Sequence, residues 1–199
     1  MQNHFTESGI STSTSLLQRA CADDQLAWQR LCRLFGPSVY RAARKLGLGV
    51  EDAADIVQDV FTSVARSLAR FDRSEPGSTF RGWLYVITRN KVRDRARMLS
   101  RRLETAPATD LQLDINLAAD EVDDDFSDDV TETQRIVHRA LEVIQIEFER
   151  STWQAFHRVT VDGAKAAEVA VELSMSVGAV YQAKSRVVKR LRLELDGLI

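Results

Sequence analysis

The chain has 199 residues, a formal net charge of −2 and 44% hydrophobic residues, so it can bury one ordinary core or two small ones. Three prolines and nine glycines supply few turns for this length, which argues against an all-β sandwich or barrel. There is no apolar run of about 18 residues, and the first residues lack the basic start and apolar core of a signal peptide, so we expect no membrane span. Cys21 and Cys32 sit among helical apolar positions, which predicts buried, reduced thiols in a cytoplasmic protein.

Charge is distributed unevenly along the chain. Residues 1–104 carry a net charge of +6, residues 105–131 a net −9 without any Lys or Arg, and residues 132–199 a net +1. Two basic segments separated by an Asp-rich one predict two domains and a linker that is mostly extended or disordered, because like charges repel and little can be buried. The expected division is an N-terminal tail over 1–13, a first domain over 14–104, an acidic flexible linker over 105–131 and a second domain over 132–199.

In both basic segments the apolar residues recur at intervals of three or four, which is typical of amphipathic helices. Gly36-Pro37 is interpreted as a break, with Pro37 opening a new helix that ends at Gly47. No segment alternates in polarity as a strand does. The sequence therefore predicts an all-α fold of two small helical domains. The expected helices are 15–22, 25–34, 37–46, 51–69, 80–102, 132–147, 151–160, 165–173 and 177–195.

The helix expected over 80–102 is strongly basic, with eight Lys or Arg side chains and one acid, Asp94. Four of its arginines recur every fourth residue, namely Arg89, Arg93, Arg97 and Arg101. They form one ridge along the helix, which suits binding to phosphates. Aromatic residues at the start of the helix can stack on unpaired bases, and Asn90 can contact a base edge. An alternative stays open, in which the ridge is a solvated face and the aromatics belong to the core. The candidates for contact with unpaired DNA are Phe80, Trp83, Arg89, Asn90, Arg93 and Arg97.

The C-terminal segment has the pattern of a helix-turn-helix. A short helix over 165–173 is followed by a tight connection, and Ser176 is a good N-cap for the helix that begins at Val177. The second helix of such a motif can lie in the major groove, with its early residues at base edges. A plain helical hairpin with a basic face is the alternative. The candidates for duplex contact are Ser176, Ala179, Gln182, Ser185, Arg186 and Lys189.

These segments together resemble a known family. The strings WQRLCRLFGPSVYRAARKLGL, VEDAADIVQDVFTSVARSLARF and STFRGWLYVITRNKVRDRAR are similar to region 2 of bacterial RNA polymerase sigma factors. The string AAEVAVELSMSVGAVYQAKSRVVKRLRLEL is similar to region 4.2. With an acidic linker in place of region 3, the layout resembles the extracytoplasmic-function (ECF) subgroup of the sigma-70 family.

The resemblance implies a sigma factor that binds core RNA polymerase and directs promoter-specific initiation. It assigns Trp83, Arg89, Asn90, Arg93 and Arg97 to opening and capture of the −10 element, and the helix-turn-helix to the −35 duplex. Many relatives have Thr at the place of Ala179 and Lys at the place of Tyr181, so the −35 preference of this chain stays open. The resemblance also makes an anti-sigma factor a plausible partner. The residues that match the surface for the polymerase clamp helices are Asp55, Gln58, Asp59 and Phe61.

Two other functional classes were compared with this interpretation. A stand-alone helix-turn-helix regulator explains the C-terminal segment but leaves VQDVF and the arginine ridge without a role. An enzyme is disfavoured because His4, His138 and His157 lack metal-motif spacing and the chain has no phosphate-binding loop. We therefore expect no catalytic activity, no cofactor and no metal ion.

Overall fold

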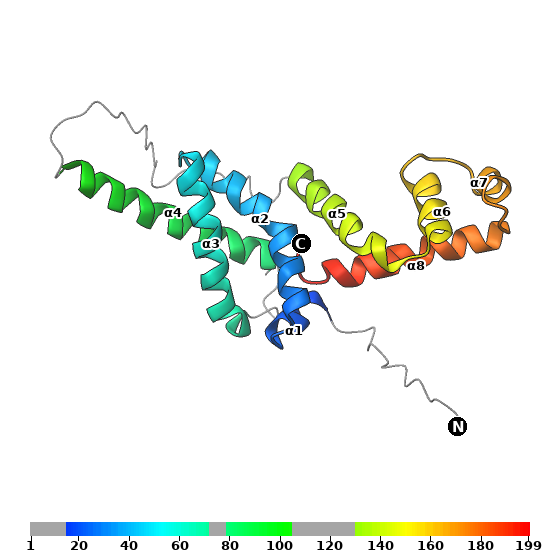
Figure 1. The fold of residues 1–199 in the computed structure, drawn as a ribbon, viewed down its shortest axis with the longest axis horizontal. Helices are drawn as coiled ribbons and strands as arrows, with labels where there is room; N and C mark the ends of the chain where they lie inside the picture. The colour runs from blue at the N-terminus through cyan, green and yellow to red at the C-terminus, as the bar shows by residue number, and fades with distance from the viewer. Residues whose placement is uncertain (1–14, 72–78, 105–129) are drawn as a thin grey trace, which may run out of the picture.

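The computed structural model describes residues 15–71, 79–104 and 130–199, without the side chains of Ser100 and of residues 102–104. Within these ranges the chain is helical and has no strand, which confirms the predicted all-α fold. Figure 1 shows the elements in chain order. They are α1 (Leu16–Cys21), α2 (Gln25–Lys45), α3 (Val50–Ser67), η1 (Leu68–Arg70), α4 (Phe80–Glu104), α5 (Val130–Ile144), η3 (Gln145–Glu147), α6 (Arg150–Thr160), α7 (Ala166–Glu172) and α8 (Val177–Leu195).

The helix α2 is continuous, so the predicted break at Gly36-Pro37 is wrong. Buried residues lie on both sides of the proline, and their packing holds the helix together although Pro37 cannot donate a backbone hydrogen bond. In the preceding turn the carbonyl of Leu34 accepts a hydrogen bond from Arg139 of α5 at 2.7 Å. The predicted end is confirmed, because Gly47 has φ of 93° and its N–H donates to the carbonyl of Arg44.

Two further expectations need correction. Cys21 is exposed at the end of α1, where its thiol lies 3.8 Å from the carbonyl oxygen of Leu68, whereas Cys32 is partly buried; both thiols are free. Helix α5 begins at Val130, so the last two residues assigned to the linker are helical. The rest of the expected linker and the N-terminal tail over 1–13 lie outside the described residues.

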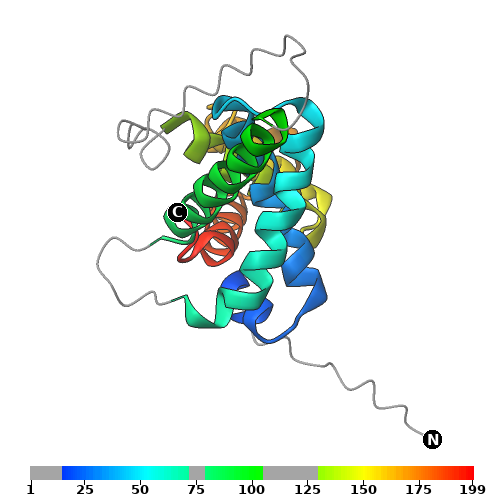
Figure 2. The same ribbon diagram turned by 90° about the vertical axis from the view of Figure 1, so that its left-hand side faces the viewer.

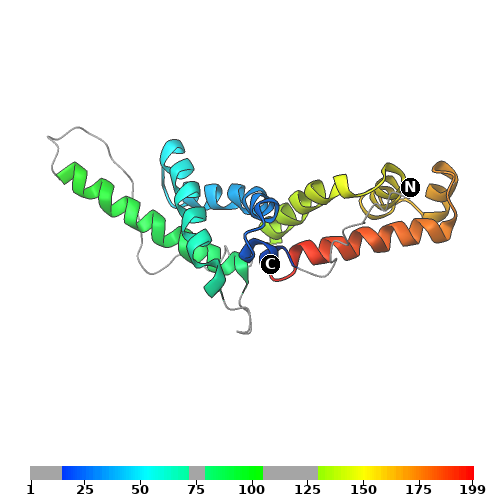
Figure 3. The same cartoon turned by 60° about the horizontal axis from the view of Figure 1, so that its bottom comes forward.

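We call α1–α4 the first half and α5–α8 the second half. Figures 1 and 2 show α4 crossing α3 in the first half, and Figure 3 shows α5 and α8 running out from it beside each other. The largest cluster of buried apolar side chains contains residues of both halves, among them Phe35 and Leu84 from the first and Ile136, Leu195 and Leu198 from the second. The two halves therefore pack against each other along one contact, which we call the seam.

The outer part of the second half has small cores of its own. One is formed by Ala155, Val169, Val180 and their neighbours from α6, α7 and α8. These contacts hold α7 and α8 together at the end of the molecule farthest from α4 (Figure 1). Among the described helices, none combines the length and the apolar character needed to cross a lipid bilayer.

Candidate nucleic-acid interface

The arginine ridge lies along α4, but its members differ in exposure. Arg97 is exposed, with 73% of its side chain accessible to solvent and a loose 3.6 Å pair to Asp94. Asn90 is also exposed, while Arg89 and Arg93 are partly buried. An exposed ion pair of this kind contributes little to stability, so Arg97 can exchange Asp94 for a phosphate at small cost.

Arg95 does not belong to the arginine ridge but ties α4 to α3, a role that was not predicted from the sequence. Its guanidinium donates to a carboxylate oxygen of Asp52 on α3 at 2.9 Å and 2.5 Å, and it also contacts Asp55 at 3.3 Å. The hydrogen bond that Arg95 donates to the carboxylate of Asp52 raises the pKa of Arg95. The signal was its position two residues after Arg93, which places it on the other side of the helix, toward α3.

The aromatic residues at the start of α4 are mostly core. Phe80 is fully buried and its ring lies 5.1 Å from that of Phe35 and 6.1 Å from that of Phe71. Its ring is therefore inaccessible to a DNA base in this conformation, and the core alternative describes it better than base stacking does. Trp83 is partly exposed and stacks on Phe71 at 5.0 Å, so one part of its ring can still meet a base.

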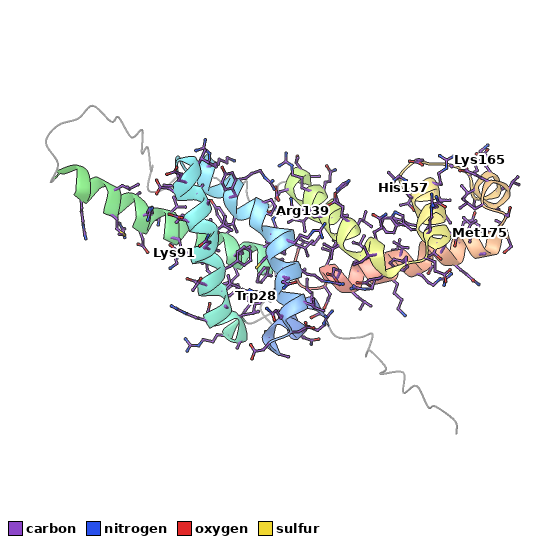
Figure 4. The ribbon with its side chains drawn as sticks, in the orientation of Figure 1. Trp28, Lys91, Arg139, His157, Lys165 and Met175 are labelled. Atoms are coloured by element: carbon purple, nitrogen blue, oxygen red, sulfur yellow. The ribbon has the colours of Figure 1, made fainter. Side chains whose placement is uncertain are left out.

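The outward side of α3 carries the polar residues assigned to polymerase contact. Asp55, Gln58 and Asp59 are exposed there. Phe61 is instead buried, with 7% exposure, and packs edge-on against Trp28 at 6.0 Å. Phe61 belongs to the buried side of α3, so it supports this surface from below and does not contact a partner directly. Figure 4 labels its neighbour Trp28.

The helix-turn-helix presents its expected residues on one side of α8. Ser176 caps the helix by accepting a hydrogen bond from the N–H of Ala179 at 3.1 Å, as predicted. Ala179 itself is partly buried. Tyr181 is 58% exposed beside these positions, an additional contact candidate that its place in the sequence already marked. The expected residues that are exposed are Ser176, Gln182, Ser185, Arg186 and Lys189.

The surfaces of α4 and α8 expose side chains that can bind a nucleic acid. In the described part of the chain, no group of three or more His, Cys, Asp or Glu side chains is arranged to hold a metal ion. The exposed candidates on α4 and α8 are cations, amides and hydroxyls, which can contact phosphates and base edges, whereas α3 exposes the carboxylates of Asp55 and Asp59.

Comparison with known proteins agrees with these surfaces. The family model described as Sigma-70 region 2 matches residues 31–102, which run from α2 to near the end of α4. RNA polymerase sigma factor NccH of Alcaligenes xylosoxydans xylosoxydans is 32% identical over 136 residues, which are 68% of this chain and 66% of that protein. ECF RNA polymerase sigma factor SigE of Mycolicibacterium smegmatis is 39% identical over 82 residues, 41% of this chain and 30% of that protein. The chain belongs to the ECF group of the sigma-70 family.

A solved structure described as CnrH in complex with the cytosolic domain of CnrY is 25% identical, covering 88% of this chain and 92% of the other, with a TM-score of 0.37. The region 2 match contains both the arginine ridge and the polar side of α3. It ends before α5, so the assignment of the second half to region 4 rests on the helix-turn-helix itself.

Proposed function

We propose that this protein is a sigma factor that binds core RNA polymerase and directs initiation at specific promoters. The observation that carries the proposal is that the region 2 match encloses the two exposed polar surfaces of the first half. The outward side of α3, with Asp55, Gln58 and Asp59, meets the clamp helices of the polymerase. Acids and an amide suit a basic coiled-coil partner. The proposed partner places the protein in the cytoplasm.

Each half makes one of the two DNA contacts: the first half contacts the −10 element and the second half the −35 element. Arg97, Asn90 and Trp83 on α4 capture bases of the −10 element once they leave the stack, and capture offsets the few kcal/mol that unstacking costs. The side of α8 around Gln182 enters the major groove at the −35 element, where Lys189 and Arg186 contact phosphates. The protein makes no bond itself, because the polymerase supplies the chemistry. Solved complexes such as that of CnrH with CnrY lead us to include a second protein, an anti-sigma factor, among its partners.

The test is run-off transcription with purified core polymerase on random promoter fragments, followed by sequencing of the transcript starts. We expect starts that share two motifs only when this protein is present. Gln182→Ala should relax the upstream motif, and Asn90→Ala should weaken the downstream one. Arg150→Ala, which removes an exposed cation at the start of α6, is the matched control. Random starts with the wild-type protein contradict the proposal.

A helix-turn-helix also suits a stand-alone regulator, and copurification separates the two functions. A sigma factor binds core polymerase that lacks any other sigma factor. A regulator acts on a polymerase that already holds one. Asp59→Arg reverses the charge on the proposed clamp surface, so it should abolish binding to core polymerase and leave duplex binding through α8 unchanged.

A further inference from the structure

Gly178 lies in the first turn of α8, on the side of the helix that carries the expected duplex contacts. Steps of four, three and four residues lead from Gly178 to Gln182, Ser185 and Lys189, and such spacings keep residues on one side of a helix. All four residues are exposed, and we call them the contact row. Figure 4 labels Met175, which lies just before this turn at the outer end of the molecule. The N-terminal member of the contact row therefore has no side chain.

The fold does not require a glycine at position 178. The backbone there is helical and lies outside the left-handed region that favours glycine. Apart from the backbone of its own helix, a Cβ atom at this position would meet only the Oγ of Ser176, at an ordinary van der Waals distance of 3.9 Å. Alanine would fit, and it stabilises a helix relative to glycine because it loses less backbone entropy on folding. The glycine therefore lowers the stability of α8, and no contact in the described part of the chain explains it.

Glycine is also found where another group approaches the backbone closely. The start of α4 shows such a case within the chain, because a Cβ atom at Gly82 would lie 3.3 Å from the Oγ1 of Thr79. At Gly178 no group of the described residues comes that close. The group that would need the space must therefore come from outside these residues, on the side of α8 that the contact row faces.

The depth to which α8 can enter a groove depends on the contact row. A helix with its side chains is about 10–12 Å across and the major groove is about 12 Å wide, so little space remains between them. Ser185 has a short side chain, and its hydroxyl can reach a base edge only if the helix axis lies deep in the groove. The early residues of such a helix lie nearest the bases, so a side chain at position 178 would be among the first to meet the DNA.

We propose that Gly178 is a positioning residue for −35 recognition: its missing side chain lets the first turn of α8 lie directly against the duplex, so that Gln182 and Ser185 reach base edges. The inference rests on the proposed function for its DNA partner. An added Cβ atom would hold the helix outward by up to a carbon–carbon bond length, about 1.5 Å. Hydrogen bonds of about 2.7–3.2 Å to the bases would then break, whereas the long side chain of Lys189 could still follow a phosphate.

Run-off transcription with core polymerase and thermal unfolding of the full chain test this role. The promoter fragments carry the upstream motif that the wild type selects, intact or scrambled, beside an intact downstream motif. Gly178→Ala should raise the midpoint of thermal unfolding by about 1–4 °C. The same variant should lower the ratio of transcription from intact to scrambled fragments by about tenfold, and Gly178→Leu should bring this ratio close to one. A purely structural role would instead change stability and selectivity in the same direction.

Gly36→Ala is the matched control, because Gly36 lies within α2 and a Cβ atom there would meet no listed neighbour within 4 Å. This variant should also gain stability, and its transcription ratio should equal that of the wild type. A ratio that both Gly178 variants keep overturns the proposal, as does a Gly178→Ala protein that loses stability and selectivity together. An equal loss of selectivity in Gly36→Ala overturns it as well. Random starts with the wild type, by contrast, contradict the proposed function, and the inference then falls with it.

Discussion

The paired glutamates of the seam make its stability dependent on pH. Burial by itself raises the pKa of Glu132, but hydrogen bonds from Ser38, Arg41 and Arg139 outweigh it, so the pKa lies below its ordinary value. For Glu147 burial is likewise outweighed, by Arg190 and Arg30. A lowered pKa in the folded state means that the contribution is complete above the unfolded pKa and is lost as pH falls through the folded one.

We expect Glu132→Gln to lower the free energy of unfolding by roughly 1–3 kcal/mol at pH 7, because four donors, on Ser38, Arg41, Arg135 and Arg139, lose a charged acceptor. The difference in free energy of unfolding between the wild type and the variant should stay constant down to about pH 5 and decrease below about pH 4. Urea unfolding at several pH values measures it, with Glu142→Gln as control. A gap that stays constant down to pH 3 would show that Glu132 is not held ionised by its partners.

Phe80 and Trp83 lie close together on α4 but are expected to have different roles. Phe80 packs in the core, and Trp83 also binds a base. Phe80→Ala should cost about 3–5 kcal/mol of unfolding free energy, because it empties the centre of an aromatic cluster. Trp83→Ala should cost less stability and weaken binding to unpaired DNA by about 1–3 kcal/mol. Urea unfolding and anisotropy of the same two proteins give both numbers. Equal stability losses with unchanged binding would assign Trp83 to the core as well.

Two arginines of α4 that are two positions apart have different roles: Arg97 is exposed for phosphate contact, and Arg95 pairs with Asp52 of α3. Arg97→Ala should leave stability nearly unchanged and reduce the slope of log K against log salt for single-stranded DNA by about 0.7, the value for one phosphate contact. Arg95→Ala should leave that slope unchanged and destabilise the pairing of α3 with α4, since Asp52 loses its donor. Salt titrations and thermal unfolding of both variants test this; identical behaviour of the two would contradict it.

Sequence patterns predicted the local features of these helices well. Gly47 as a helix end and Ser176 as an N-cap follow from the chemistry of single residues, and the structure confirms both. The break at Pro37 failed because packing on both flanks, which depends on distant helices, overrides a local signal. The seam could not be predicted, since Ser38 and Arg41 meet a glutamate more than ninety residues away and nothing local marks that encounter.

The core that the two halves share couples their unfolding. Because Leu198 and Ile136 belong to the same apolar cluster as Phe35, we expect one cooperative thermal transition for the first half and α5 together. Leu198→Asp should split that transition in two, as the halves then unfold separately. Calorimetry detects the difference. Two transitions in the wild type would show that the halves are independent in solution.

The residues that cap the start of α4 are synthesised long after the helix itself. A ribosome completes α4 before Gly197 and Leu198 exist, and the 95 residues after Glu104 take about 5–20 s at the usual rates of translation. During that interval the amides of Phe80 and Arg81 lack the two carbonyls that accept their hydrogen bonds in the finished protein. The start of α4 therefore acquires its caps only when the last residues of the chain have been made, so a chain cut short before Gly197 would leave these two amides without their acceptors.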